Sequence, residues 1–377
     1  MDHVVKIKKG LDIQLEGIPS PKISNTPDSQ LYAIIPDDFV GLTPKVIVKP
    51  GEKVLTGSPV IHDKTHPNIV VPSPVSGEIV TIERGERRKV IKITIKPDAS
   101  QQALEFGRFD LENMDSSEIK DLLLKSGIFA FIKQRPYDIV ANPDTAPRDI
   151  FVTAFDSAPL APDYAFILKE EKQHFETGLK ALNKLTSGKV YVGISQRQPI
   201  DVKNATSVIF DGPHPAGNVG IQINHIAPIN KGDTVWTMSA LDVLFIGRLF
   251  DKGIADFSRI VAVTGSEIDD PHYVRTRIGA SIASITQGMV KAVEYEQRYI
   301  SGNVLTGVKT NADGYIGATH SQITVIPEGN NYDEFLGWAS LNPHKYSTSH
   351  SYFSWLLGKK KKYTIDARIR GGERAII

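Results

Sequence analysis

The sequence predicts a multidomain α/β protein, and three observations lead to that prediction. Its 377 residues exceed what one hydrophobic core usually serves, so we expect several domains. Residues 148–192 follow the order strand, loop, helix, strand, which is the unit of a parallel α/β sheet. The stretches before about residue 98 and after residue 259 instead carry short apolar runs between turns, a pattern typical of β structure.

The composition excludes several classes of function. The chain has 44 basic and 43 acidic residues, a net charge of +1, so no overall field attracts nucleic acid. It contains no cysteine, which excludes disulfides, thiolate nucleophiles, cysteine-ligated zinc and ordinary iron–sulfur clusters within these residues. No apolar run approaches the roughly 20 residues that span a bilayer, and the N-terminus lacks the apolar core of a signal peptide. We therefore expect a soluble, cytoplasmic chain, unless a partner holds it at a membrane.

Residues 1–100 are the first predicted domain and read as β structure. Residues 90–96 alternate apolar and polar positions from Ile91 onward, as a half-buried strand does. Pro-Gly, Thr-Gly and Ser-Gly turns at residues 50–51, 56–57 and 76–77 separate short Val and Ile pairs. This rhythm resembles that of the biotinyl/lipoyl-like β barrel.

One loop of this domain, residues 62–68, has functional interpretations that compete with a structural one. Lys64 resembles the lysine that carries lipoate in carrier domains, but the hairpin here is longer and Pro67 stiffens it. An unmodified turn is therefore favoured, and lipoylation of Lys64 remains the alternative. His62 and His66 have the spacing of a helical zinc motif, but no glutamate lies between them and Pro67 opposes a helix. We expect two solvated histidines and no metal site.

Residues 101–256 are the predicted α/β domain, which is Rossmann-like but lacks a glycine-rich loop. Helices are expected over residues 111–125, starting near Ser116, and after Asp163, which caps the second one. Ligands of such sheets bind where the first strand meets its loop, here residues 155–159. Because this loop has no glycine to bring backbone N–H groups close to a phosphate, a structural crossover is favoured over a dinucleotide site.

The glycine-rich stretch of residues 212–220 also belongs to this domain. Gly212 and Gly217 have the spacing that opens a P-loop, but the lysine and hydroxyl residue that bind phosphate and Mg²⁺ do not follow. No NTPase site is therefore expected. A rigid Pro/Gly turn is the structural interpretation, and a contact of His214 with a partner or a quinone is the functional one.

The last strand and helix of the domain are expected within residues 233–253. The helix should start at Ser239, with Asp242 completing an approximate capping box, and end at Gly253 in a left-handed cap. We expect a core helix without a catalytic role.

Residues 257–330 resemble the soluble-ligand-binding β-grasp (SLBB) domain, with a strand, a turn, a short strand and a helix from Gly279. Such domains bind ligands in some proteins and only connect domains in others, and the connector interpretation is favoured. Further strands are expected at residues 304–308 and 323–326. Residues 331–377 are expected to form a β-rich extension. Its run Lys359–Lys362 is interpreted as a solvated turn or, alternatively, as a contact with acidic lipid headgroups or a membrane partner.

Five motifs together resemble one family. They are IKKGLDIQLEG (residues 7–17), SPVSGEIVTIERG (73–85), FDGPHPAGNVG (210–220), VRTRIGAS (274–281) and ISGNVLTG (300–307). Their wording and order are similar to those of the A subunits of the Na+-translocating NADH:quinone oxidoreductases, over essentially the whole chain. This family is related to the C subunit of the Rnf complex and to the flavoprotein subunit of respiratory complex I. The resemblance implies that a further helical domain follows residue 377.

The resemblance also implies a function. It predicts a peripheral subunit on the cytoplasmic face of the bacterial inner membrane, in a complex that couples NADH oxidation and ubiquinone reduction to Na+ export. In the flavin-binding relatives a glycine-rich stretch lies against flavin mononucleotide, and here Phe129, Phe131, Arg135 and Tyr137 stand in its place. We therefore expect no redox centre, catalytic residue or metal in this chain. FMN, FAD and iron–sulfur centres are expected in partner subunits, which include membrane subunits.

Quinone could still contact this chain. An apolar aromatic surface with a polar donor suits a quinone, so Phe131, Arg135 and Tyr137 are the candidate residues, with aromatic packing against a neighbouring helix as the structural alternative. The competing class is a soluble ligand-binding or lipoyl-like carrier protein, which would not copurify with membrane subunits. An NADH-oxidising flavoenzyme would be yellow, and the missing glycines argue against it.

Overall fold

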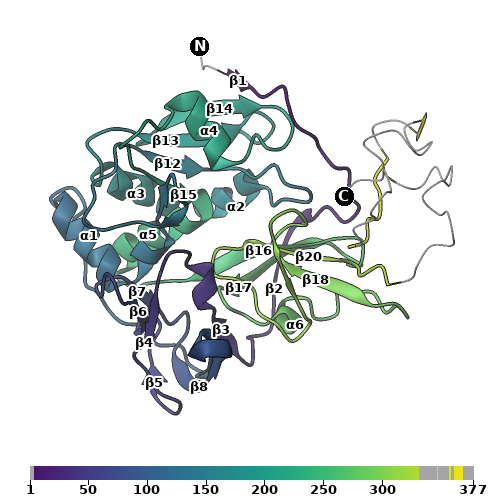
Figure 1. The fold of residues 1–377 in the computed structure, drawn as a ribbon, viewed down its shortest axis with the longest axis horizontal. Helices are drawn as coiled ribbons and strands as arrows, with labels where there is room; N and C mark the ends of the chain where they lie inside the picture. The colour runs from purple at the N-terminus through teal and green to yellow at the C-terminus, as the bar shows by residue number, and fades with distance from the viewer. Residues whose placement is uncertain (1–3, 331–345, 347–355, 358–360, 368–377) are drawn as a thin grey trace.

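The computed structural model describes residues 4–330, 346, 356–357 and 361–367 (Figure 1). Within them the strands form a seven-stranded, a six-stranded, a four-stranded and a three-stranded sheet. The seven-stranded sheet lies at the upper left of Figure 1, the six-stranded sheet at the right and the two small sheets at the lower left. The predicted fold class is confirmed, because an α/β domain, a barrel and a β-grasp domain occur in one chain.

The seven-stranded sheet is the centre of the α/β domain. Its order is β1-β14-β13-β12-β15-β10-β11, in which the first five strands are parallel and β10 and β11 form an antiparallel edge. The strands are β1 (Val4–Lys6), β10 (Lys133–Arg135), β11 (Ile139–Val140), β12 (Ile150–Thr153), β13 (Val190–Ser195), β14 (Thr206–Asp211) and β15 (Val235–Ser239).

Helices cover both faces of this sheet. Alternate side chains of a strand point to opposite faces, so Phe151 of β12 packs with Ile223 on one side. Val152, its neighbour, lies in the main core with Phe175 on the other side. The helices are α1 (Ser116–Lys125), α2 (Tyr164–Glu170), α3 (Lys172–Asn183), α4 (Val219–Ile226) and α5 (Ala240–Lys252). The predicted strand-loop-helix-strand unit of residues 148–192 is therefore confirmed, with β12 and β13 parallel.

The ends of two helices differ in detail from the prediction. Helix α1 starts at Ser116 as expected, but its cap is Asp115, which forms a capping box with Glu118. Helix α5 starts after Ser239, whose hydroxyl accepts a hydrogen bond from the Leu241 N–H at 3.3 Å. The capping box predicted for Asp242 is wrong, because this carboxylate is buried and faces another partner.

That partner is Arg259, at the start of the SLBB domain. The Asp242 carboxylate accepts a hydrogen bond from the Arg259 guanidinium at 2.5 Å, and both side chains are buried. The guanidinium also lies 5.0 Å from the ring centre of Phe245. Two buried opposite charges therefore tie α5 to the neighbouring domain.

The six-stranded sheet has the order β19-β18-β20-β16-β17-β2. Its strands are β2 (Ser20–Asn25), β16 (Ser258–Thr264), β17 (His272–Arg277), β18 (Gln297–Ser301), β19 (Val308–Thr310) and β20 (Gln322–Pro327). The strand predicted at residues 304–308 starts only at Val308, as β19, because the Asn303 side chain accepts hydrogen bonds from the N–H groups of Leu305 and Thr306 and makes a turn before it. The helix expected from Gly279 is a single turn, α6 (Ile282–Ile285).

The two small sheets form the barrel at the lower left of Figure 1. The four-stranded sheet has the order β3-β9-β8-β5 and the three-stranded sheet the order β4-β6-β7. Their elements are β3 (Tyr32–Ile34), β4 (Pro44–Val46), β5 (Lys53–Val54), β6 (Pro59–Asp63), β7 (Val70–Pro72), β8 (Gly77–Arg84) and β9 (Val90–Pro97). Strand β9 contains the alternating stretch predicted from the sequence. Single-turn 3-10 helices lie at Pro36–Asp38, Glu86–Arg88 and Ile128–Phe131.

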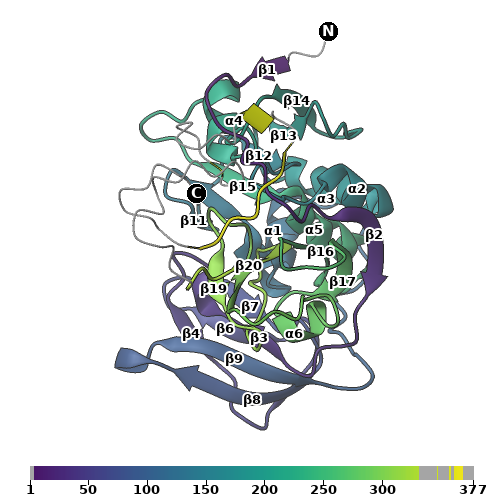
Figure 2. The same ribbon diagram turned by 90° about the vertical axis from the view of Figure 1, so that its right-hand side faces the viewer.

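The first two strands leave the barrel and join the other two domains. β1 pairs in parallel with β14, with Val5 opposite Phe210, and β2 pairs in parallel with β17. Figure 2 shows this N-terminal segment running from the top of the molecule, past the α/β domain, to the edge of the six-stranded sheet. One continuous apolar core extends through all three domains. The N-terminal segment therefore links domains that lie far apart in the sequence.

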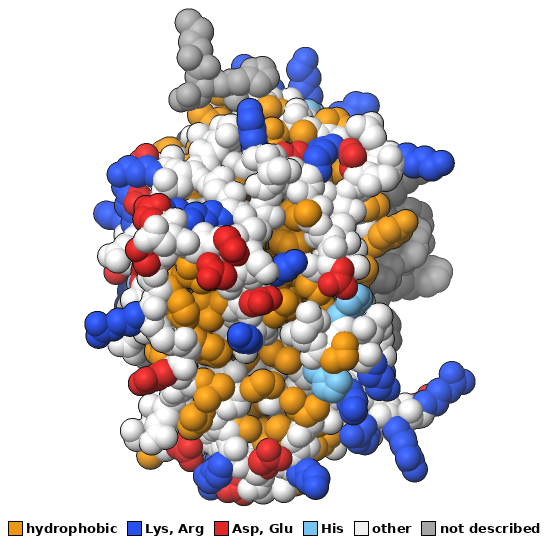
Figure 3. Space-filling view, turned by 90° about the vertical axis from the view of Figure 1, so that its left-hand side faces the viewer, with side chains coloured by type: hydrophobic (Ala, Val, Ile, Leu, Met, Phe, Trp, Pro, Cys, Tyr) orange, Lys and Arg blue, Asp and Glu red, His pale blue; other side chains and the backbone are white. Residues whose placement is uncertain are grey.

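The surface and the helices give two further observations. Figure 3 shows acidic and basic side chains interspersed with apolar ones over most of one face, with Lys and Arg side chains projecting at its lower right. None of the helices in the described part of the chain has the length and apolar character that crossing a bilayer requires. Most of the predicted β-rich extension of residues 331–377, including Lys359 and Lys360, lies outside the described residues.

Candidate functional site: a cavity at the carboxyl edge of the sheet

The parallel strands of the α/β domain define a point where a ligand site is expected. From β12 the chain passes through α2 and α3 to β13 on one side, whereas β15 lies on the other side of β12. The loops that follow β12 and β15 therefore diverge at the carboxyl edge, which is where open α/β sheets bind ligands.

A cavity of about 350 Å³ lies at this edge. Residues from the ends of β12 and β15 line it, together with residues of the 212–217 loop, the start of α4, strand β10 and the SLBB domain. The lining residues are Phe131, Lys133, Arg135, Asp138, Thr153, Phe155, Asp156, Ala158, Tyr164, His214, Gly217, Asn218, Val219, Thr237, Met238, Ser239, Asp242, Asn303, Leu305, Thr306 and Thr319. The size is within the range of pockets that hold small organic ligands.

Phe131 lies at the junction of the domains and on the wall of the cavity. Its side chain is 3% exposed. Its ring centre lies 5.4 Å from that of Phe39, 5.2 Å from Phe245 and 6.0 Å from Phe257. The neighbouring Phe129 is fully buried against Trp236, at 5.5 Å. Phe131 therefore packs in the core and also borders the cavity, and its contact with a quinone stays a prediction.

Strand β10 presents two basic side chains to the cavity. Lys133 and Arg135 are two residues apart, so they lie on the same side of the strand. Asp138 pairs with both, at 3.7 Å from the Lys133 ammonium and 3.2 Å from the Arg135 guanidinium. The Nε atom of Arg135 is buried and has no hydrogen-bond partner among the described residues.

Tyr137 lies apart from the other two candidates. It occupies the turn between β10 and β11 and is 77% exposed. It does not line the cavity, although its neighbour Asp138 does. The structure therefore brings Phe131 and Arg135 together and leaves Tyr137 outside the lining.

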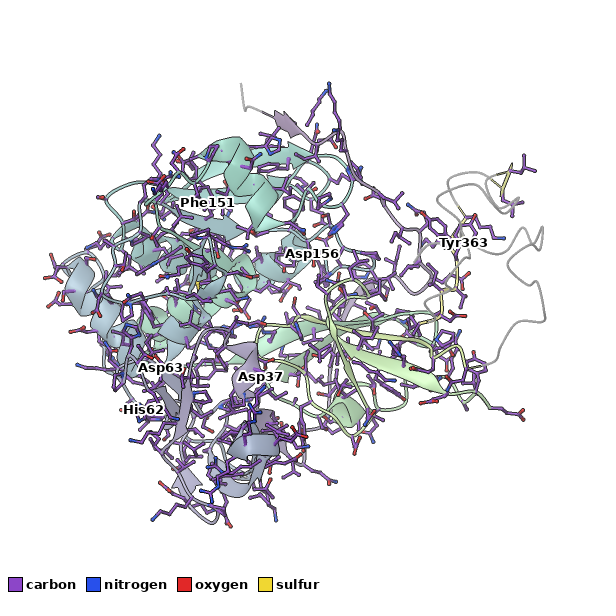
Figure 4. The ribbon with its side chains drawn as sticks, viewed as in Figure 1. Asp37, His62, Asp63, Phe151, Asp156 and Tyr363 are labelled. Atoms are coloured by element: carbon purple, nitrogen blue, oxygen red, sulfur yellow. The ribbon has the colours of Figure 1, made fainter. Side chains whose placement is uncertain are left out.

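The loop after β12 forms another wall of the cavity. Phe155 is buried at 4% exposure, and the Asp156 carboxylate accepts a hydrogen bond from the Ala158 N–H at 2.8 Å. Burial raises the pKa of Asp156 above its usual value. Figure 4 shows Asp156 between the seven-stranded sheet and the SLBB domain. The loop that the sequence indicated as a ligand position does therefore border a cavity.

The 212–217 loop reaches the cavity because other residues hold it in place. The His214 N–H donates to the Asp12 carboxylate at 2.9 Å, and the His214 carbonyl accepts from the Leu11 N–H at 2.9 Å. A Cβ atom on Gly10 would lie 2.0 Å from that carbonyl oxygen, so only glycine fits there. The motifs of residues 7–17 and 210–220, which are far apart in sequence, thus meet at one point.

Sequence reasoning missed Lys133 and Asp12 in this site, and it named Ser157 only as part of the 155–159 loop, without its contact to His214. The only sequence signal for Lys133 was its two-residue spacing from Arg135 in a segment that was not assigned as a strand. Ser157 and Asp12 act on His214 from distant parts of the chain, and no local pattern marks such contacts.

The loop of Lys64 is a compact structural turn. The buried Asp63 carboxylate accepts hydrogen bonds from the N–H groups of Thr43 and His66, at 2.7 and 2.8 Å. His62 and Asp63 are marked in Figure 4. Lys64 is exposed, and the histidines lie on a strand end and a turn, not on a helix. Within the described residues no group of three or more His, Asp or Glu side chains could hold a metal ion.

The fold and these motifs define a chain built from a barrel-sandwich hybrid domain, an α/β domain and an SLBB domain, joined by a common core. Family models with these descriptions match it in the same order. The NqrA N-terminal barrel-sandwich hybrid domain matches residues 5–98, the NqrA second alpha/beta domain residues 114–255, and the NQRA C-terminal domain residues 260–312.

Individual relatives lead to the same family. The chain is 37% identical over 383 residues to the A subunit of the Na(+)-translocating NADH-quinone reductase of Serratia proteamaculans, covering 99% of this chain and 84% of that protein. The corresponding protein of Yersinia pestis bv. Antiqua is 35% identical over 381 residues, with the same coverage. The chain therefore belongs to the NqrA family, the A subunits of the Na+-translocating NADH-quinone reductases. The family resemblance read from the five motifs is confirmed.

A solved structure of an NAD+-reducing [NiFe]-hydrogenase in the air-oxidized state is also similar, at a TM-score of 0.38 and 8% identity. It covers 60% of this chain and 52% of the hydrogenase chain. This likeness is too low to support any argument about function.

Proposed function

We propose that this chain is a peripheral subunit of a Na+-translocating NADH-quinone reductase and contributes a quinone contact without carrying a redox centre. The observation that carries the proposal is the cavity at the carboxyl edge of the seven-stranded sheet. It brings the apolar Phe131, Phe155 and Met238 together with hydrogen-bond donors on β10. A quinone needs this combination, because its ring is apolar and its two carbonyl oxygens only accept hydrogen bonds.

The chemistry of the side chains supports a non-redox role. The sequence has no cysteine, so an ordinary cysteine-ligated iron–sulfur cluster has no ligands here. The loop after β12, residues 155–159, has no glycine for a flavin phosphate, and Phe129 and Phe131 fill core positions beside it. In this proposal the FMN, FAD and iron–sulfur centres and the Na+ path belong to the partner subunits, which include membrane subunits.

A quinone titration of the assembled complex tests the contact. Arg135→Ala removes a donor from the cavity wall, so we expect quinone binding to weaken by about tenfold or more. Tyr137→Ala should change binding less, because Tyr137 lies outside the lining. Arg84→Ala is the matched control, since Arg84 is an exposed arginine on β8 that does not line the cavity. Equal affinity in Arg135→Ala and Arg84→Ala would contradict the quinone contact.

The peripheral position on the cytoplasmic face has its own test. A peripheral subunit should leave the membrane in an alkaline carbonate wash, whereas integral subunits stay behind. In inside-out vesicles, protease should cleave this chain, and in right-side-out vesicles it should not. The opposite pattern of cleavage would place the chain on the other face.

The carrier interpretation remains the competing prediction. It rests on the exposed Lys64 in the turn after β6. The intact mass of the chain purified from its natural host decides it, because lipoylation adds a defined mass to one lysine. An unmodified mass, together with copurification of membrane subunits, would exclude the carrier interpretation and leave only the reductase interpretation.

A further inference from the structure

His214 is held with its imidazole ring at the cavity. Its backbone is fixed on both sides by the N-terminal segment, through Asp12 and the Leu11 N–H, as described above. Its side chain contacts Ser157, with the Oγ of Ser157 3.0 Å from the Nδ1 of His214. His214 lines the same cavity as Lys133 and Arg135. Residues from two distant parts of the chain, the N-terminal segment and the loop after β12, thus hold His214 at the cavity.

The hydrogen bonds of Ser157 favour one of the two nitrogen atoms of His214 as the carrier of the ring proton. The Ser157 oxygen accepts a hydrogen bond from the Gly217 N–H at 2.8 Å. The hydroxyl has one proton of its own, and the Nδ1 of His214 is the acceptor within reach. When the hydroxyl donates to Nδ1, that nitrogen is unprotonated and the neutral ring carries its proton on Nε2. This arrangement gives every proton at Ser157 a partner.

Gly217 makes this contact geometrically feasible. A Cβ atom on residue 217 would lie 2.5 Å from the Ser157 backbone nitrogen and 2.9 Å from its Oγ. Any other residue would push Ser157 away from the loop. The second glycine of the apparent P-loop spacing therefore serves the contact between two loops at the cavity.

We propose that His214 donates a hydrogen bond from its Nε2–H to a carbonyl oxygen of the quinone, and that Ser157 is a positioning residue that sets this tautomer. The inference rests on the quinone contact proposed above and adds a donor on a second wall of the cavity. Lys133 and Arg135 on β10 supply donors from one side, and His214 supplies one from the 212–217 loop. The two carbonyl oxygens of a quinone then have donors from two different elements that line the cavity.

The other charged groups at the cavity are compatible with this role. Asp242 is paired with Arg259, and Asp138 is paired with Lys133 and Arg135. Asp156 accepts from the Ala158 N–H. These carboxylates are acceptors and cannot donate to a quinone carbonyl when ionised, so among the charged and imidazole side chains of the lining the donors are Lys133, Arg135 and His214.

Three variants separate the nitrogen atoms of His214. In His214→Gln the side-chain amide N–H falls near the position of Nε2, so it should keep the donor. In His214→Asn the shorter amide falls near the position of Nδ1, so the donor to the quinone is lost. Ser157→Ala leaves the backbone contacts of His214 in place but frees the tautomer, and an intermediate effect is expected.

The measurement is the infrared spectrum of short-tailed ubiquinone, labelled with ¹³C at its carbonyl carbons, bound to the assembled complex. A hydrogen bond lowers the carbonyl stretching frequency, which a purely structural role of His214 would not do. The lowered band of the unaltered complex should persist in His214→Gln, disappear in His214→Asn and weaken in Ser157→Ala. Affinity for the same quinone should fall about tenfold in His214→Asn, the effect of losing one hydrogen bond.

The results distinguish this proposal from the one on which it rests. If Arg135→Ala weakens binding but His214→Asn leaves the carbonyl band unchanged, the role of His214 is refuted and the quinone contact stands. If neither Arg135→Ala nor His214→Asn alters bound quinone, the quinone contact itself fails. Loss of the band in both His214→Asn and His214→Gln would refute the assignment of the donor to Nε2.

Discussion

Phe131→Ala should uncouple the domains, because the ring of Phe131 joins them. The ring contacts Phe39 from the barrel, Phe245 from α5 and Phe257 at the entry to the SLBB domain, all within 6.0 Å between centres. Truncating a buried Phe to Ala usually costs about 3–5 kcal/mol, of which each aromatic pair supplies roughly 0.5–1.5 kcal/mol. In this variant the lost free energy comes from contacts between domains, because the three partner rings belong to different domains.

The matched control is Phe151→Ala. Phe151 is also almost fully buried, and its ring stacks on Tyr191 at 5.2 Å, but its contacts lie within the α/β domain (Figure 4). Both variants lose a similar ring, so both should lose a similar total free energy of unfolding. Only Phe131→Ala should weaken the connection of the barrel and the SLBB domain to the rest of the molecule.

Hydrogen exchange read by mass spectrometry separates the two cases. In Phe131→Ala, exchange should accelerate in the barrel residues 32–97 at denaturant concentrations that still leave the seven-stranded sheet protected. In Phe151→Ala, the acceleration should start in the sheet. If both variants lose protection in the same segments and in the same order, the ring of Phe131 does not couple the domains.

Three further predictions concern single side chains. The Arg298 hydrogen bond, with Lys309 nearby, lowers the pKa of Glu328 to about 2, so its stabilisation is present above about pH 4.5 and is lost as the pH falls through 2. After screening by solvent we expect this ion pair to contribute about 1–2 kcal/mol to the free energy of unfolding. Urea unfolding at pH 6 and pH 3 measures it, because the free energy of unfolding should change less between the two pH values in Glu328→Gln than in the unaltered chain. Burial raises the pKa of Asp38 to about 6, so its contribution is favourable below about pH 4 and is lost as the pH rises through 6. Thermal unfolding of Asp38→Asn should lack this decline, and an identical decline would contradict the assignment. Asp115→Ala removes the capping box of α1 and should cost about 1 kcal/mol, whereas Asp115→Asn should retain most of it.

Local patterns in the sequence were sufficient for the α/β unit. The helical spacing of apolar residues located α3, and the left-handed Gly253 located the end of α5, because periodicity and caps depend on neighbouring residues. The loop of residues 155–159 was placed correctly between β12 and the helix that follows, and the structure adds that a cavity lies beside it.

Contacts between distant parts of the chain could not be read in the same way. The pairing of β1 with β14 and of β2 with β17 depends on strands about 200 or more residues away. The residues beside Asn303 are apolar and therefore have the pattern of a strand. The turn forms through hydrogen bonds of the Asn303 side chain, which hydrophobic periodicity does not detect. The contact of Ser157 with His214 likewise joins two loops that only the folded sheet brings together.

The position of the first strand has a consequence for how the protein is made. Val5 finds its partner at Phe210, so the opening segment leaves the ribosome well before the strand that it must join. At about 5–20 residues per second, roughly 10–40 seconds of synthesis separate the two. During this interval the nascent N-terminus has an unsatisfied strand edge that a chaperone could shield. A fragment ending near residue 100 would never meet that partner, and a tag placed before Val4 would sit at the edge of the seven-stranded sheet.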